Sequence, residues 1–376
     1  MKKNKILVLA LFCLGVLLCS GCSSRSALNS SSSWPGITAD GDVVYAANGG
    51  FVEAVRDGQK VWSYPESSSR SAFYAAPAAD EDHVFAGSYS NHLLVLNKAD
   101  GSLAADIEVG NTKNKIIASP LLADGKVIVL SSGGMVSSYP ADAAGESIAA
   151  DWQTTLSGEV WVKPVCENGS LYVASMDKKM NVLDAKTGEV KQTIDISGAI
   201  MSDPILADGK IYFSTLANEV DEMDPETLEI RPLLTTEGEL WASPLLMGDK
   251  LITADMNGIV YIVDVNTAET VWKSDKLTAN KVGFIASPVA LDDANFLLVD
   301  ETGEIMIYDL DGKSVGQRTM SQSVYTTPVI MDNGTIVLVP VSDNGQLKAY
   351  APELKEEWIY TRTSEKDSKE ENKEGK

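Results

Sequence analysis

Eight prolines recur along this chain at intervals of 40 to 44 residues, and this spacing constrains the fold more than any other feature. Internal similarity at a period of about 40–50 residues is typical of propellers and other repeat architectures. Each repeat must therefore be one small structural unit that buries its apolar faces against its neighbours. The prolines are Pro35, Pro77, Pro120, Pro164, Pro204, Pro244, Pro288 and Pro328.

The residues around the prolines repeat as well, and they describe four short strands in each unit. Ala-Ser-Pro occurs at 118–120, 242–244 and 286–288. Proline has no N–H to donate, so it suits the start of a strand, and it biases the preceding residue towards extended geometry. Asp-Gly or Asn-Gly follows, as at 124–125 and 168–169, and predicts a tight hairpin turn. Two further turns separate β-branched or aromatic runs in each unit.

This pattern predicts an all-β, eight-bladed β-propeller of four-stranded antiparallel blades over residues 34–363. The last unit has four strands of its own, and residues 23–33 are too rich in serine to supply a closing strand. The sequence therefore does not predict how the ring is closed.

The N-terminus has the features of a bacterial lipoprotein signal. A basic start within residues 2–5 precedes an apolar run over residues 6–18, and small residues lead to Cys22. We expect residues 1–21 to be removed and Cys22 to be lipidated, with residues 22–33 as a serine-rich tether. The alternative is an ordinary secretory signal with a chance cysteine. The lipoprotein interpretation places the chain in the cell envelope, facing the periplasm or the cell exterior.

Charge and cysteine content limit the partners and the redox chemistry. The chain has 53 acidic and 31 basic residues, a net charge of −22, so its surface repels nucleic acid and anionic lipid. Membrane attachment is expected through the lipid at Cys22 alone. Only Cys166 remains once the signal is cut and Cys22 is modified, which rules out an internal disulfide. Residues 364–376 are charged and polar throughout, and we expect a disordered tail there.

Within the repeat, Ala-Asp-Gly-Lys at 207–210 and Leu-Asp-Ala-Lys-Thr-Gly at 183–188 resemble the PQQ-like β-propeller repeat family. Eight such units behind a lipidation motif resemble the BamB group of that family, lipoproteins of the outer-membrane β-barrel assembly machinery. The resemblance implies a non-enzymatic scaffold whose partner is a protein of that machinery. No partner-binding residue can be carried over.

The same repeat also builds quinoprotein dehydrogenases. Resemblance to those enzymes would imply pyrroloquinoline quinone held over the ring centre, usually with Ca²⁺. This chain has no adjacent cysteine pair and little length for the insertions that wall such a site. We therefore expect no enzyme activity, no cofactor and no metal. His83, His92 and the turn at 184–188 show no metal-ligand spacing, and we interpret them as surface and turn residues.

One set of residues is a candidate binding surface. The residue three places before each proline is large in seven of the eight units, and four of these are aromatic. We expect either packing between blades or a rim that receives a partner, since such aromatic side chains are enriched at binding surfaces. A second functional hypothesis has the ring hold a peptide or a glycan at its central funnel. The candidate rim residues are Tyr74, Trp161, Trp241 and Tyr325.

Four other tryptophans lie near the ends of the predicted fourth strands. In a propeller such residues pack one blade against the next, so we expect these to be structural. They are Trp62, Trp152, Trp272 and Trp358.

Overall fold

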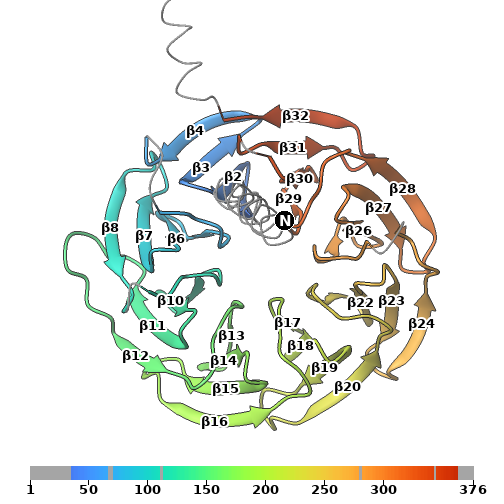
Figure 1. The fold of residues 1–376 in the computed structure, drawn as a ribbon, viewed down its shortest axis with the longest axis horizontal. Coiled ribbons are helices and arrows are strands. Elements are labelled where there is room, and N and C mark those ends of the chain that lie inside the picture. The colour runs from blue at the N-terminus through green and yellow to red at the C-terminus, as the bar shows by residue number, and fades with distance from the viewer. Residues whose placement is uncertain (1–34, 67–70, 111–112, 279–281, 343, 363–376) are drawn as a thin grey trace, which may run out of the picture. The chain divides into compact units, whose positions relative to one another are not determined.

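The computed structural model describes residues 35–66, 71–110, 113–278, 282–342 and 344–362. In these ranges the chain forms eight four-stranded antiparallel sheets. Figure 1 shows them arranged as a ring, with the first strand of each sheet nearest the centre and the fourth at the outside. The predicted all-β, eight-bladed propeller is confirmed. No helix long and apolar enough to cross a membrane is found in the described ranges, and the predicted signal, tether and tail lie outside them.

The strands follow one another in chain order within every blade. Blade 1 contains β1 (Gly36–Asp40), β2 (Val43–Asn48), β3 (Phe51–Arg56) and β4 (Gln59–Tyr64), and blade 2 contains β5 (Ala78–Ala79), β6 (His83–Gly87), β7 (His92–Asn97) and β8 (Leu103–Glu108). Blade 3 contains β9 (Leu121–Ala123), β10 (Lys126–Ser131), β11 (Met135–Pro140) and β12 (Trp152–Thr155), and blade 4 contains β13 (Val165–Glu167), β14 (Ser170–Ser175), β15 (Lys179–Asp184) and β16 (Val190–Asp195). Blade 5 contains β17 (Ile205–Ala207), β18 (Lys210–Ser214), β19 (Glu219–Met223) and β20 (Ile230–Thr235), and blade 6 contains β21 (Leu245–Met247), β22 (Lys250–Ala254), β23 (Val260–Asp264) and β24 (Glu269–Lys273). Blade 7 contains β25 (Val289–Ala290), β26 (Asn295–Val299), β27 (Glu304–Asp309) and β28 (Ser314–Thr319), and blade 8 contains β29 (Val329–Ile330), β30 (Ile336–Leu338), β31 (Leu347–Tyr350) and β32 (Glu356–Tyr360).

The prolines and turn residues identified in the sequence coincide with the strand boundaries. Each of the eight prolines stands directly before the first strand of its blade, where the missing N–H is not needed. At the first hairpin of blade 3, Asp124 and Gly125 have φ angles of 49° and 70°. Two consecutive positive φ angles are the mark of a type I′ turn, whose twist matches the flanking strands.

Alternate residues of the inner strands pack against different neighbours. In β10, Val127 and Val129 join the apolar cluster shared with blade 2, whereas Ile128 and Leu130 join the cluster shared with blade 4. This follows from the two-residue period of a strand, which sends successive side chains to opposite faces. A blade buried on both faces therefore reads as a continuous apolar run, and burial between blades is the main force that holds the ring.

The residue four places before a proline fills the seam between blades in seven of the eight units. These seven side chains are apolar and have at most 2% of their surface exposed. The prediction from the sequence chose the residue one place later and missed this set, although an apolar residue recurs there in every unit but the first. The seam residues are Phe73, Ile116, Val160, Ile200, Leu240, Phe284 and Val324.

Fourth-strand side chains tie each outer strand to the next blade. The Trp62 indole N–H of blade 1 donates to the Lys98 carbonyl of blade 2 at 2.9 Å, and its ring lies against Gly101, whose φ is +71°. Trp152, Trp272 and Trp358 lie against glycines of the next blade in the same way. These tryptophans lie within the fourth strands, and Trp152 begins its strand rather than ending it.

The ring closes without the exchange of a strand. Every sheet consists of four consecutive strands, so blade 8 meets blade 1 through side chains. Glu53 of β3, with 1% of its surface exposed, accepts a hydrogen bond from the Tyr360 hydroxyl at 2.9 Å. The Arg362 guanidinium donates to both Glu53 oxygens, at 3.0 and 2.6 Å. This buried bidentate pair, together with the Thr326 hydroxyl that donates to the Pro35 carbonyl at 2.8 Å, gives the closure polar contacts that the sequence did not predict.

Candidate functional site

The propeller has two different ends. In an antiparallel meander, the first and third turns of a blade lie at one end, and the second turn lies at the other. The Ala185 N–H in the third turn of blade 4 donates to the Gly169 carbonyl in its first turn at 2.9 Å. At the other end, the Met176 N–H in the second turn donates to Glu159, which precedes the blade, at 2.8 Å. We call these ends the hairpin face and the connector face, a connector being the segment that precedes each proline.

The four predicted rim residues lie on connectors, and each is half-buried. The Trp161 indole N–H donates to the Glu159 carboxylate at 3.0 Å, and the Trp241 indole donates to Glu239 at 3.3 Å. The seams are filled by the preceding residue, so these rings keep part of their surface in solvent. The connector face thus presents aromatic rings beside carboxylates at blades 4 and 6.

A third aromatic group lies at the connectors of blades 2 and 3. The Tyr74 ring packs edge-on against Tyr89 of the second turn of blade 2, with centroids 4.8 Å apart. The Lys115 ammonium lies 4.7 Å from the centroid of the Tyr89 ring, a cation–π contact. Tyr325 is half-buried on the connector of blade 8. The structure places all four residues on connectors, and their role as a binding rim stays a prediction.

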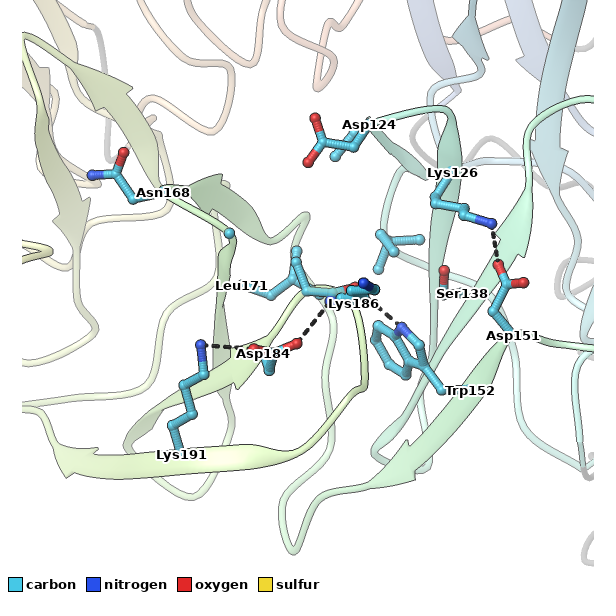
Figure 2. A pocket seen from close by; sticks show the side chains of 14 residues that line it. Asp124, Lys126, Ser138, Asp151, Trp152, Asn168, Leu171, Asp184, Lys186 and Lys191 are labelled. Atoms are coloured by element: carbon cyan, nitrogen blue, oxygen red, sulfur yellow. Dashed lines mark hydrogen bonds and ion pairs between the residues drawn. The ribbon is translucent and has the colours of Figure 1, made fainter.

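On the hairpin face, a groove of about 670 Å³ separates blades 3 and 4. Figure 2 shows Lys126 paired with Asp151 on one wall and Lys191 paired with Asp184 on the other, at 2.8 and 2.9 Å. Trp152 lies between them and donates its indole N–H to the Ala185 carbonyl at 3.1 Å. Four of the charged side chains in this groove are therefore paired with one another.

Asp184 is the carboxylate of this groove whose pKa is clearly lowered. The Lys191 ammonium, followed by the backbone N–H groups of Thr187 and Lys186, lowers the pKa of Asp184 to about 2. A carboxylate held so far below neutral pH does not move protons there. Its hydrogen bonds close the turn at 184–188, which confirms the turn interpretation of that motif.

The centre of the ring holds a second cavity of about 680 Å³. Its walls come from the first strands of blades 1 and 5–8 and the prolines of blades 1 and 6–8, with Ala76 from the segment before blade 2, and include Ile205, Leu206 and Val289. None of the four rim residues lines it. The funnel hypothesis therefore concerns this cavity rather than the aromatic rim.

The chemistry of the central cavity does not fit a quinone. The described residues that line it include no lysine, arginine or histidine, so among them a polycarboxylate such as pyrroloquinoline quinone has no cationic partner. In the described ranges, no three His, Cys, Asp or Glu side chains are grouped to hold a metal ion. The donor set thus gives no support to quinoprotein chemistry.

The histidines and the free cysteine are accounted for by local contacts. His92 pairs with Asp106 at 2.6 Å on the surface of blade 2, and His83 lies 4.0 Å from Asp80. Cys166 packs at the edge of the apolar cluster between blades 3 and 4, and burial raises the pKa of its thiol. A raised thiol pKa makes it a poor nucleophile.

Comparison with known proteins agrees with this geometry. The sequence model of the family described as outer membrane protein assembly factor BamB matches residues 48–147, 142–243 and 256–371. The chain belongs to this family. The propeller is similar to the crystal structure of BamB from Moraxella catarrhalis, with a TM-score of 0.66 and 18% sequence identity over 85% of this chain and 91% of that one.

The fold is also similar to that of a computationally designed protein, Ika8. The TM-score is 0.67 and the identity 13%, over 88% of this chain and 96% of the designed one. At such identities the similarity establishes the propeller fold and not a shared activity. No curated protein matches the chain.

Proposed function

We propose that this chain is a lipid-anchored, extracytoplasmic propeller that acts without catalysis as a docking platform for another protein. The carrying observation is the family match, which covers most of the propeller. A rigid disc held by eight apolar seams, with half-exposed aromatic rings on one face, suits protein docking. The family's description adds the finer proposal that the partner belongs to outer-membrane β-barrel assembly.

The docking proposal is tested by photo-crosslinking in the native host with full-length lipoprotein. A photoreactive amino acid replaces Trp161 or Trp241 on the connector face, and Asp124 or Asp208 on the hairpin face serves as the matched control. We expect the connector positions to capture a β-barrel assembly component and the hairpin positions not to. Capture from the hairpin face alone would move the docking surface, and capture of no assembly component from either face would refute the assembly role.

Anchoring is tested separately because it rests on the signal motif alone. Cys22→Ala should abolish labelling by radioactive palmitate and leave residues 1–21 attached, which mass spectrometry of the purified protein would show. Retention of the label in this variant would refute lipidation at Cys22.

A second candidate function is a binding module with its ligand, a peptide or a glycan, at the ring centre. The observation that favours it is the central cavity of about 680 Å³, which is in the size range of small-ligand sites. A quinoprotein dehydrogenase is disfavoured by the lining described above. Dehydrogenase activity after incubation with pyrroloquinoline quinone and Ca²⁺ would overturn that exclusion.

A further inference from the structure

The central cavity has mostly apolar walls with one charged group. Leu206 keeps 39% of its surface exposed, although it stands on an innermost strand. Ile205, Leu245 and Val329 line the same space. Among the lining residues, Asp203 is the only one with an ionisable side chain. A few polar groups in an apolar concavity are what a ligand site requires.

Asp203 belongs to a belt of three hydrogen bonds that join neighbouring blades beside the cavity. In each of the three, the residue directly before a proline donates its N–H to the side chain of the equivalent residue in the next blade. Ser243 donates to the Ser287 hydroxyl at 2.9 Å, and Ser287 donates to the Thr327 hydroxyl at 3.0 Å. Lys163 donates to Asp203 Oδ1 at 2.7 Å.

A hydroxyl is sufficient for this belt, as blades 7 and 8 show. At blade 5 the same place is taken by a carboxylate, whose charge and second oxygen the belt does not use. Folding gains nothing from an ionised group here, because placing a charge among apolar walls costs free energy. The charge and the second oxygen of Asp203, which the belt does not need, point to a ligand.

The electrostatics of the cavity select the sign of that ligand. Burial raises the pKa of Asp203, and this effect outweighs the opposing effects of the Lys163 N–H and the Lys163 ammonium. The Lys163 N–H and the Lys163 ammonium are the groups that stabilise this carboxylate, and low-dielectric walls strengthen its attraction for a further cation. The acidic surface of the chain acts in the same direction.

We propose that the central cavity binds an amphipathic cation, whose ammonium or guanidinium group pairs with Asp203 while its apolar part packs against Leu206 and the facing first strands. This inference rests on the second candidate function, in which the cavity is the site, and does not depend on docking at the connector face. It excludes anionic ligands of the same size.

The test is isothermal titration calorimetry of the full propeller with three probes of equal length: octylammonium, octanol and octanoate. We expect octylammonium to bind at least tenfold more tightly than octanol, and octanoate not to bind. Asp203→Ser keeps the belt by supplying a hydroxyl acceptor like that of Ser287 in blade 7, and should remove the preference for octylammonium. Asp208→Asn, in the exposed turn of the same blade, is the matched control and should change nothing.

The outcomes distinguish whether the cavity is a ligand site from whether its ligand is a cation. Equal binding of octanol, or of octanoate, to the wild-type cavity would keep the site and refute the cation. No binding of any probe would refute the cavity as a site. Octylammonium binding unaffected by Asp203→Ser would place the probe on the outer surface and refute the proposal. Leu206→Ser gives a second check. Loss of this apolar side chain should weaken the binding of both octylammonium and octanol, and because the side chain is partly exposed the thermal midpoint should not fall.

Discussion

Replacement of Arg362 by alanine should open the ring where blade 8 meets blade 1. Arg362 is the last polar group of the closure, and its guanidinium donates to both oxygens of Glu53. The Glu53 side chain is 2% exposed and that of Arg362 is 17% exposed, so water screens the pair poorly. Glu53 and the Tyr360 hydroxyl would remain, with a buried carboxylate held by one neutral donor.

The expected loss is large because the variant leaves a buried charge unpaired. Removing one partner of such a pair costs about 3–5 kcal/mol, most of it the desolvation of the remaining ion. Arg362 also lies 4.2 Å from the centre of the Phe51 ring, and losing that cation–π contact adds about 0.5–1 kcal/mol. The matched control is Arg56→Ala, whose pair with Asp42 has side chains 49% and 69% exposed and should cost about 0–1 kcal/mol.

Equilibrium urea unfolding gives the two free-energy changes, and hydrogen exchange shows where the loss falls. In Arg362→Ala, faster exchange should be confined to blades 1 and 8. The double variant Glu53→Gln with Arg362→Ala should recover part of the loss, because the buried charge is gone. If Arg362→Ala costs no more than Arg56→Ala, or if Glu53→Gln gives no recovery, the closure does not depend on this pair.

Three further predictions address the seams and a buried acid. Gly101→Ala should lower the free energy of unfolding by about 1–3 kcal/mol more than Gly125→Ala. Both glycines have φ near +70°, but only at position 101 would the new Cβ lie 2.5 Å from Trp62. Equal losses in urea unfolding would show that backbone strain alone accounts for the effect. Trp272→Ala should cost about 3–5 kcal/mol through the cavity left between blades 6 and 7, and an unchanged unfolding midpoint would contradict this role. Burial, with the nearby Glu219 carboxylate, raises the pKa of Asp221 from 3.8 to about 6. Between these pH values the folded state binds a proton that the unfolded state has released, so the free energy of unfolding falls as pH rises from about 4 to 6. Asp221→Asn should remove this dependence and stabilise the protein at pH 7.5 by up to about 3 kcal/mol, and a pH profile of the thermal midpoint identical to that of the wild type would refute the shift.

Much of the fold could be predicted because its determinants are local. A proline at the start of a strand, an Asp-Gly turn and an alternating apolar run each report on a few neighbouring residues, and they recur eight times in agreement. The same reasoning placed Trp161 and Trp241 on segments that the structure finds half-buried on the connector face. It did not separate them from Val160, one place earlier, which fills the seam. The tryptophan and the valine before it are both apolar residues in the sequence, and only the direction in which each side chain points distinguishes them.

The sequence by itself determined the number of blades and the strands within each blade, whereas lipidation at Cys22 stays a prediction. Only the tertiary structure decided how the ring closes and what its centre offers a ligand. Glu53 and Arg362 stand 309 residues apart, and no local pattern pairs them. Asp203 has no distinguishing motif in the sequence, and it becomes the one ionisable group among the described residues of the central cavity only when the ring brings the first strands together. Periodicity fixes the repeated contacts between neighbouring units, whereas closure and cavity chemistry depend on the places where individual repeats depart from the pattern.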